Sequence, residues 1–523
     1  MSSVVVIGAG VAGLTAAYRL RQAGHRVTVL EAKPHAGGLS TTVRDGSVVT
    51  EVHDGELVTQ TVQLPEGCYI NLGPGRLPHH HRRILALCRE LRVPLEPYIM
   101  SSDANYYADA ATGARYRRRR LDHDARGYIA ELAHQLDGGD VFDANELALL
   151  RSFGDLGPDG IYRGTDRAGG GKPVSFEQLT RMRFWDYLFW QPSAYLWQDS
   201  MFQPCGGMDQ IWRALLATGI EVRYNAPVQR IRQRGRRVQV TWSWGGQRVS
   251  ESFDWCLSSV PLPLLAQMDL QGFSQEYLEA VQGAEFAPAC KVGWTSLTRW
   301  WEDDEIYGGI SYSSHDIRQF WYPSVGHFAA GPATLTGAYN SYEPAARYQD
   351  MSVPDRLVDA RRGGMLLHPE MGDGDLVPDE MAATVAWARV PYQAGGWAHW
   401  DPARPEHETW FDTLQRADGR FVAIGCQVSQ WPGWQEGAVA TAERAVAMVT
   451  GAELAGGEVG EAVETGVPVP DSRWLTEGDH PARGRKRSAQ AWPFREMWFV
   501  SDIPLRSKWD GACDGASGGR SPR

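Results

Sequence analysis

The sequence predicts an α/β fold with a Rossmann-like, dinucleotide-binding unit near its N-terminus. A β-branched run at residues 4–7 is typical of a buried parallel strand. Gly8, Gly10 and Gly13 follow with the spacing of a dinucleotide-binding turn, and a helical pattern begins at the same place. A second strand then ends in Glu31. A strand, a glycine-rich turn, a helix and a second strand in this order predict a βαβ unit more specifically than glycine spacing alone.

The glycines, the start of the helix and Glu31 indicate which kind of dinucleotide this unit binds. Glycines let the backbone approach a pyrophosphate closely, and the first turn of the helix offers N–H groups and the positive end of its dipole. Glu31 can accept hydrogen bonds from ribose hydroxyls. A carboxylate at that place repels a 2′-phosphate, so the sequence argues against an NADP-type ligand.

Strand patterns return in two later parts of the chain. Two alternating strands joined by an Arg-Gly turn are expected within 219–244, and a buried strand follows at 253–265. Residues 419–449 have the pattern of a strand, a loop and an Ala-rich helix. The dinucleotide-binding domain is therefore expected to be discontinuous. The predicted division is a dinucleotide-binding domain at 1–75, 205–268 and 415–450, a substrate-binding domain at 76–90 and 269–414, a helical insert at 91–204, and a C-terminal extension at 451–523 with a disordered end.

Composition excludes several classes of protein. A chain of 523 residues is expected to form two or three structural units. Its net charge of -11 argues against a nucleic-acid partner. The seven cysteines are odd in number and show no metal-ligand spacing, which predicts reduced thiols, a cytoplasmic protein and no metal site. No secretion signal precedes the first strand, and no apolar run predicts a membrane span.

Two stretches leave alternatives open. The basic run RYRRRR, at 115–120, is expected to be a solvated surface patch, with contact to an acidic partner as the alternative. The stretch RFWDYLFWQPSAYLW, at 183–197, contributes to a high total of 21 Trp. It predicts either a packed helical core or an aromatic enclosure for a substrate.

Seven blocks between residue 4 and about 450 resemble, in the same order, the flavin-dependent amine oxidases. Among these, the chain is most similar to the L-amino-acid oxidases and the related amino-acid 2-monooxygenases. The blocks are the N-terminal fingerprint with LEAKPHAGG, then NLGPGRLPHHH, QPCGGMDQIWRAL, YNAPVQRI with CLSSVPLPLL, ACKVGWTSLTRWWEDDEIYGG, VPYQAGGWAHW and GWQEGAVATA. The resemblance implies a FAD-binding domain of the glutathione-reductase type, a mixed-sheet substrate domain and non-covalent FAD.

The resemblance also assigns the substrate site. Arg76 matches the arginine that clamps the substrate carboxylate, for which a planar guanidinium is suited. Tyr392 resembles the tyrosine that adds a second hydrogen bond to that carboxylate. Lys291 resembles the lysine that reaches flavin N5 through a water. Trp434, after Gly433, matches an aromatic residue beside the substrate amine and the flavin face.

The cofactor residues follow in the same way. Val228 resembles the residue whose backbone meets the adenine, and the helix that begins near Glu436 is expected to aim its N–H groups at the flavin O2 region. The complete set implied by the resemblance is Gly8, Gly10, Gly13, Glu31, Ala32, Gly38, Gly73, Pro74, Arg76, Val228, Gly425, Cys426, Trp434 and Ala438.

The sequence departs from the family pattern at two cofactor positions. Leu39 stands where the family has an arginine after its second glycine pair, so one pyrophosphate contact must come from elsewhere. Cys426 or Gln427 stands where the family has an acid on the ribityl chain. Relatives that decarboxylate their substrate also vary at this second place.

The expected reaction is oxidative deamination of an L-amino acid, with molecular oxygen as acceptor and hydrogen peroxide as product. Three alternatives remain open: an amino-acid 2-monooxygenase, an oxidase of amines that lack a carboxylate, and a flavoprotein without catalytic activity. The side chain of the substrate is not specified by the sequence, although the Trp content suggests an aromatic pocket and acids of the helical insert suggest a basic substrate. A homodimer is expected, with the helical insert or the loop at 153–173 as its interface.

Overall fold

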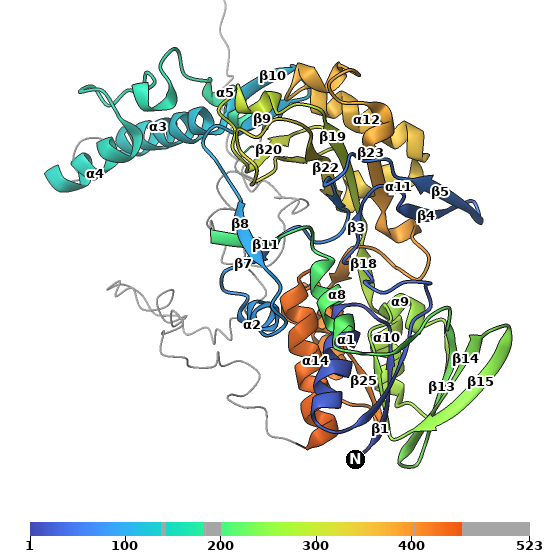
Figure 1. Ribbon diagram of the computed structural model, residues 1–523. Coiled ribbons are helices and arrows are strands. Elements are labelled where there is room, and N and C mark those ends of the chain that lie inside the picture. Colours follow the sequence, from blue (N-terminus) through green and yellow to red (C-terminus); the bar gives the residue numbers. More distant parts are fainter. Residues whose placement is uncertain (138–142, 183, 185–199, 402, 452–523) are drawn as a thin grey trace, which may run out of the picture.

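The computed structural model describes residues 1–137, 143–182, 184, 200–401 and 403–451. Two lobes are visible in Figure 1, one around β1, α1 and α14, and the other around β19, β22 and β23. Most of the Trp-rich stretch and nearly all of the C-terminal extension lie outside the described residues, so their predicted structures are left untested.

A five-stranded parallel sheet forms the centre of the first lobe. In β1, Val5 pairs with Thr28 on one side and with Cys256 on the other. The strands come from three distant parts of the chain, which confirms the discontinuous fold that the sequence predicts. In spatial order the strands are β12 (Val222–Arg223), β2 (Arg26–Leu30), β1 (Ser3–Ile7), β16 (Trp255–Ser258) and β25 (Phe421–Ala423).

Helices cover this sheet through a continuous apolar core. Leu14 and Leu20 of the first helix are fully buried, together with Val439 and Ala442 of the last helix. Burial of this apolar surface holds the N-terminal and C-terminal parts of the domain together. The helices of this layer are α1 (Val11–Gln22), α2 (Arg82–Glu90), α8 (Gln210–Ala217) and α14 (Gln435–Thr450).

The predicted hairpin after residue 219 is confirmed. Its two strands are antiparallel, and Arg234 pairs with Arg237 at the tight turn. Val238, Val240 and Trp242 point into a core shared with the parallel sheet, and all three are fully buried. The four strands of this sheet are β15 (Gln247–Phe253), β14 (Arg237–Trp244), β13 (Val228–Arg234) and β17 (Asp269–Gln271).

A seven-stranded mixed sheet forms the second lobe. One of its strands, between β22 and the edge strand β23, is buried along its whole length, from Ala289 to Ser296. One pair of strands is parallel and the other neighbours are antiparallel, which confirms the mixed sheet expected for the substrate domain. The order is β10 (Ala114–Arg117), β9 (Tyr106–Asp109), β20 (Ile310–Ser313), β21 (Gln319–Trp321), β22 (Ala333–Ser341), β19 (Ala289–Ser296) and β23 (Ala382–Ala386).

The helical insert is shorter than the predicted 91–204. Three strands precede it: β8 (Leu95–Ile99), β9 and β10. All four residues of β9 are buried, and β9 pairs with a strand 200 residues away in the chain, so its structure depends on tertiary pairing that local periodicity does not reveal. The helices then form an arm that extends from the body (Figure 1) and comprise α3 (Arg118–Asp137), α4 (Ala144–Gly154) and α5 (Phe176–Met182).

The basic run at 115–120 holds the base of this arm in place. Arg115 donates to the Leu367 carbonyl, and Arg117 donates to the Ala104 carbonyl. Arg120 donates to carbonyls of the loop at 170–172 and pairs with buried Asp124 at 3.1 Å. These three arginines are therefore engaged within the chain, which corrects the expectation of a solvated patch for them.

The remaining elements connect and flank the lobes. The further helices are α9 (Leu262–Leu265), α10 (Gln275–Gln282), α11 (Tyr342–Asp350), α12 (Val353–Met365) and α13 (Pro405–Leu414). The further strands are β3 (Thr42–Val43), β4 (Val48–His53), β5 (Glu56–Thr61), β6 (Ile70–Asn71), β7 (Leu77–Pro78), β11 (Ser200–Pro204), β18 (Glu285–Ala287) and β24 (Trp397–His399). In the part of the chain that the structure describes, no helix is both long enough and apolar enough to cross a membrane.

Candidate active site

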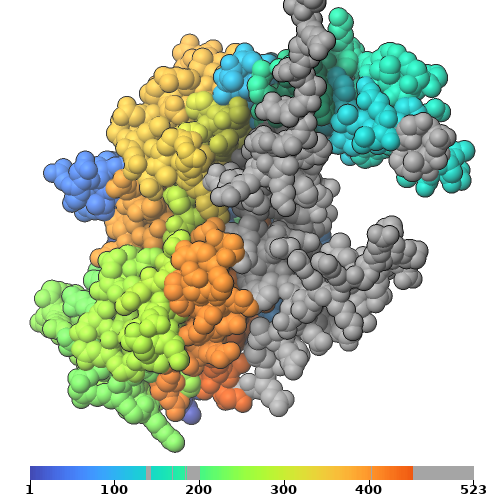
Figure 2. Space-filling model, turned by 180° about the vertical axis from the view of Figure 1, so that it is seen from behind, coloured from blue at the N-terminus to red at the C-terminus, as the bar shows by residue number. Residues whose placement is uncertain are grey.

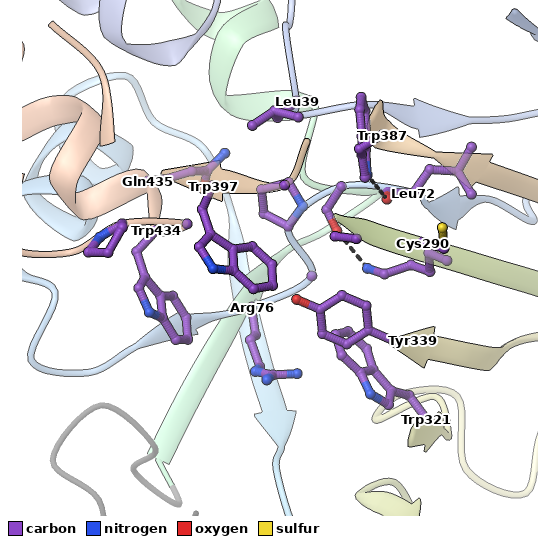
Figure 3. Close-up of a pocket in the computed structure, with 18 of the residues that line it drawn as sticks. Leu39, Leu72, Arg76, Cys290, Trp321, Tyr339, Trp387, Trp397, Trp434 and Gln435 are labelled. Atoms are coloured by element: carbon purple, nitrogen blue, oxygen red, sulfur yellow. Dashed lines mark hydrogen bonds between the residues drawn. The ribbon is translucent and has the colours of Figure 1, made fainter. Parts of the chain in front are cut away.

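A large cavity lies where the two lobes meet, and it encloses about 1110 Å³, including the part open to solvent. Its wall combines a loop after β6, the strands of the mixed sheet and the start of α14 (Figure 3). Most of the lining is aromatic or aliphatic, and few groups carry charge. The lining residues are Leu39, Leu72, Gly73, Pro74, Gly75, Arg76, Ala289, Cys290, Lys291, Trp321, Tyr339, Tyr342, Trp387, Gly396, Trp397, Pro432, Gly433, Trp434 and Gln435.

The predicted phosphate turn has the form that a dinucleotide requires. A Cβ on Gly13 would lie 1.9 Å from the Gly8 carbonyl oxygen, so no larger residue fits there. The second glycine pair lies against this turn, because Gly37 donates to the Ala9 carbonyl at 3.0 Å. Gly10 precedes α1 without a side-chain cap, so the first N–H groups of the helix face a bare backbone surface. The cradle therefore fits a pyrophosphate.

Glu31 lies at the end of β2, where the sequence predicts it, and its carboxylate already orders the turn. Glu31 is 8% exposed and accepts hydrogen bonds from Ala9 N at 2.7 Å and Lys33 N at 2.9 Å. Its own carbonyl accepts from Ala226 N, which brings the stretch before Val228 beside the nucleotide end of the turn. Ala32 follows directly. These positions agree with a ribose and adenine site.

Lys291 is buried in the cavity wall. Its Nζ donates to the carbonyls of Asn71 at 3.0 Å and Gly73 at 2.6 Å. Burial, together with the positive charge of Arg76, lowers the pKa of Lys291 to about 7. A neutral amine that donates both N–H groups keeps one lone pair. Lys291 can therefore act as a base or hold a water near neutral pH.

Arg76 belongs to the loop between β6 and β7, lines the cavity and is 5% exposed. Its guanidinium carbon lies 4.4 Å from the ring centroid of Trp321 and 5.8 Å from that of Tyr98. Stacking on aromatic rings fixes the plane of the guanidinium without neutralising its charge. Arg76 therefore offers a fixed cation to an anionic group that enters the cavity.

Tyr339 and Tyr342 line the cavity, and the predicted Tyr392 does not. Tyr392 is 49% exposed and lies outside the lining. It occupies a turn closed by Gln393 N to the Val390 carbonyl, and its φ of 62° directs it away from the wall. Tyr339 lines the cavity instead, with its hydroxyl directed inward beside Arg76 (Figure 3). This placement corrects the prediction for Tyr392.

Trp434 is the residue that precedes α14, and it lines the cavity. Trp434 and Trp397 form one wall of the cavity (Figure 3). The ring of His81 meets Trp434 edge-on with centroids 4.9 Å apart. Glu436 accepts hydrogen bonds from the first N–H groups of α2, which ties the start of α2 to the start of α14. Ala438, one turn into α14, is buried.

The two departures from the family pattern have structural consequences. Leu39 lines the cavity, so an apolar side chain occupies the place of the family arginine. The side chain of Gln427 forms hydrogen bonds with the backbone: it accepts from Leu262 N and donates to the carbonyls of Val260 and Ile424. Cys426 is thus the residue at the place of the family acid, and burial raises the pKa of its thiol.

Gly73, Pro74 and Gly425 are three further residues of the predicted cofactor set. Gly73 and Pro74 line the cavity, and a Cβ on Gly73 would lie 1.7 Å from the Leu39 carbonyl oxygen. Gly425 has a φ of 106° and donates to Thr441 Oγ1 at 2.9 Å, which joins β25 to α14. Across the described parts of the chain, no group of three or more His, Cys, Asp or Glu side chains could hold a metal ion.

The phosphate turn and the cavity together fit a protein that binds a dinucleotide and a small molecule. Residues 11–450 match the family model of the flavin containing amine oxidoreductases. The chain belongs to this family, and membership implies a flavin cofactor.

Several relatives of the chain carry the name of an L-amino-acid oxidase. The flavin-dependent L-tryptophan oxidase RebO of Lentzea aerocolonigenes is 26% identical over 494 residues, which cover 85% of this chain and 97% of that protein. An L-amino-acid oxidase of Siganus canaliculatus is 26% identical over 472 residues, 84% of each chain. The putative L-amino-acid oxidase YobN of Bacillus subtilis is 23% identical over 478 residues, 83% of this chain and 92% of that protein.

Solved structures support the fold. Putrescine oxidase bound to putrescine aligns with a TM-score of 0.57 at 19% identity, over 86% of this chain and 99% of that chain. Cyclohexylamine oxidase from Brevibacterium oxydans IH-35A aligns with a TM-score of 0.58 at 16% identity, over the same shares of each chain. At these identities the likeness concerns the architecture alone.

Proposed function

We propose that this protein is a FAD-dependent L-amino-acid oxidase. The observation that carries the proposal is a buried arginine and a buried lysine in one aromatic cavity: Arg76 stacked on Trp321, and Lys291 bonded to the backbone of the same loop. An amino acid presents a carboxylate to the first group and an amine near the second. The L-amino-acid oxidases among the relatives support this assignment.

The residues present fit FAD held without a covalent bond. The phosphate turn receives the pyrophosphate, Glu31 receives the ribose, and the start of α14 faces the cavity. Because burial raises the pKa of Cys426, its thiol stays protonated and is a poor nucleophile for covalent attachment. Bound FAD would supply acceptance of a hydride from the substrate Cα and transfer of two electrons to oxygen, which gives hydrogen peroxide. Hydrolysis of the resulting imino acid would release a 2-oxo acid and ammonia.

The side chains of this protein bind and orient the substrate. Arg76 grips the carboxylate in a bidentate manner, and the Tyr339 hydroxyl adds a hydrogen bond from the same side. Trp397 and Trp434 exclude water from the opposite wall. Lys291, neutral above its pKa of about 7, accepts a proton directly or through a water as the substrate amine is deprotonated.

Two other activities have specific observations in their favour. An oxidase of amines without a carboxylate is favoured by the family description, which names amines and not amino acids. Arg76 argues against it, because a guanidinium in the cavity wall disfavours a substrate that carries only a positive charge. An amino-acid 2-monooxygenase is favoured by Cys426 in place of the family acid, and it would release an amide and carbon dioxide.

A peroxide-coupled screen tests the assignment. The purified holoprotein is assayed with the twenty L-amino acids and with the amine formed by decarboxylation of each. An L-amino-acid oxidase turns over at least one amino acid far faster than its amine and releases ammonia and peroxide in equal amounts. Turnover of amines alone, release of carbon dioxide, or no bleaching of the flavin band under anaerobic mixing would each contradict it.

We also propose that the protein is a homodimer built on the helical arm. Ile129, Leu132 and Leu136 follow one face of α3 at helical spacing and are 48%, 43% and 86% exposed. Leu149 and Phe153 continue the apolar surface on α4, 70% and 46% exposed. The arm projects from the body of the molecule (Figure 2), so a second copy can reach this surface.

Light scattering after gel filtration tests the dimer. A variant with Leu136→Glu and Leu149→Glu is expected to elute as a monomer, while the parent elutes with twice the monomer mass. Phe328→Glu serves as the matched control, because Phe328 is 80% exposed and lies between β21 and β22, outside the arm. A monomeric parent, or a double variant of parental mass, would contradict the proposal.

A further inference from the structure

Gln435 is a polar residue of the cavity wall that belongs neither to the phosphate turn nor to the substrate site described above. Gln435 is the first residue of α14, lines the cavity and is 6% exposed. Its Nε2 donates to Ser40 Oγ at 2.8 Å. Its Oε1 is buried without a hydrogen-bond partner among the described residues. A buried amide carbonyl without a partner costs about 1–3 kcal/mol, so a ligand that donates to it is expected.

The partner of Gln435 is held rigidly beside the phosphate turn. Ser40 N donates to the Gly37 carbonyl at 2.9 Å, and the Ser40 carbonyl accepts from Trp212 Nε1 at 2.9 Å. Gly37 in turn donates to the Ala9 carbonyl of the phosphate turn. Ser40 therefore connects Gln435 to the pyrophosphate cradle, while Gln435 itself faces the cavity that contains Arg76.

This position corresponds to one part of the cofactor. In FAD the ribityl chain joins the pyrophosphate to the isoalloxazine ring, so a group between the phosphate turn and the catalytic cavity faces that chain. The ribityl chain carries hydroxyls, which both donate and accept. A hydroxyl therefore satisfies Gln435 in either orientation of its amide, whereas a phosphate oxygen could only accept from the amide nitrogen.

Two family contacts are missing near this position: the contact of the arginine with the pyrophosphate and the contact of the acid with the ribityl chain. Leu39 lines the cavity with an apolar side chain, and Cys426 occupies the place of the family acid while Gln427 is bonded to the backbone. We infer that Gln435, held by Ser40, is a cofactor-binding residue that takes over the hydrogen bond to a ribityl hydroxyl of FAD in this protein. The inference rests on the proposed FAD-dependent function and adds a residue to its cofactor site.

The test measures the affinity of the apoprotein for FAD, with no substrate present. The probes are FAD and three analogues that each lack one ribityl hydroxyl, at C2′, C3′ or C4′. The variants are Gln435→Leu, Ser40→Ala and Gln282→Leu. Gln282 is an exposed residue at the end of α10, so its replacement repeats the same chemical change away from the cavity.

Gln435→Leu is expected to weaken FAD binding about tenfold, the equivalent of one buried hydrogen bond, and Ser40→Ala about threefold. Gln282→Leu is expected to bind as the parent does. For one of the three analogues the parent and Gln435→Leu should bind equally well, because the hydroxyl that Gln435 contacts is then absent from both complexes. This equality separates a contact with the cofactor from a general effect on the fold.

Two results would overturn the inference: parental FAD affinity in Gln435→Leu, or the same loss for FAD and for all three analogues. Both differ from failure of the proposed function. A parent protein that binds no FAD, or that binds FAD but oxidises no amino acid, contradicts the proposed function. A parent that binds FAD and oxidises amino acids, with an unaffected Gln435→Leu variant, contradicts this inference alone.

Discussion

The phosphate turn and the substrate cavity are built in opposite ways. The turn is largely local: Gly13 packs on Gly8 within one βαβ unit, and the Glu31 carboxylate accepts from Ala9, 22 residues away. The cavity wall joins residues that are far apart in the sequence. Lys291 donates to carbonyls 220 and 218 residues away, and Trp321 stacks on Arg76 from another strand. The turn therefore depends on backbone shape, and the cavity depends on how two lobes meet.

This difference predicts two kinds of mutational response. A change in the turn should act on cofactor retention and folding together, because no side chain can move to relieve a backbone clash. A change in the cavity should act on catalysis while the fold survives, because the lobes keep their separate cores. The following predictions test that division, from the largest expected effect to the smallest.

Gly13→Ala is expected to abolish flavin retention. Its Cβ would lie 1.9 Å from the Gly8 carbonyl oxygen and 3.1 Å from its carbon, and both are backbone atoms. The expected cost exceeds about 3 kcal/mol, because the strand and the helix must separate. The ratio of flavin to protein absorbance and the urea midpoint measure the effect.

Gly46→Ala is the matched control. Gly46 has a φ of 73° and no heavy atom within 4 Å of an added Cβ, so only the backbone preference is lost, at about 1 kcal/mol. Full flavin content in Gly13→Ala would show that the turn is not the rigid cradle described above.

Lys291→Met is expected to lower kcat/KM about 100-fold at pH 8, with flavin retained, because the base of the cavity is lost. The parent should gain activity as the pH rises through about 7, where Lys291 loses its proton, and the variant should lack this step. A parental pH profile in Lys291→Met would contradict the role of the lysine.

The same lysine links folding stability to pH. Its pKa falls from 10.5 to about 7 in the fold. A base with a depressed pKa contributes stability above its unfolded pKa, and that contribution is lost as the pH falls through about 7. Urea titrations of the parent between pH 6 and 10 should therefore show stability that rises with pH more steeply than in Lys291→Met.

Tyr339→Phe is expected to raise KM about tenfold with little change in kcat, because one hydrogen bond to the substrate carboxylate is removed from ground state and transition state alike. Tyr392→Phe is the control, since Tyr392 is half exposed and outside the cavity. The reverse pattern, with the effect at Tyr392, would restore the residue that the sequence predicts.

The sequence was sufficient for the local parts of the molecule. The βαβ unit, the hairpin around Gly235 and the strand before α14 all appear where their patterns place them, because turns and short-range periodicity encode them directly. Arg76 and Lys291 both line the cavity, and each lies inside a motif with its own recognisable neighbours.

Parts that depend on distant pairing were missed. Tyr392 belongs to a motif that resembles the family, yet the turn at Val390–Gln393 turns its side chain to solvent. Tyr339 lies in a strand without a distinctive motif, and only the order of β21, β22 and β19 in the sheet brings it beside Lys291. Gln435 carries no signal of its own, because its role depends on Ser40, 395 residues away.

The most direct test of the central claim, that Arg76 grips a carboxylate, is a comparison of matched substrates in the parent and in Arg76→Ala. The L-amino acid that the parent oxidises fastest is paired with its decarboxylated amine, and kcat/KM is measured for both. The account predicts a loss of about 1000-fold for the amino acid and less than about threefold for the amine. Equal losses for the two substrates would contradict it.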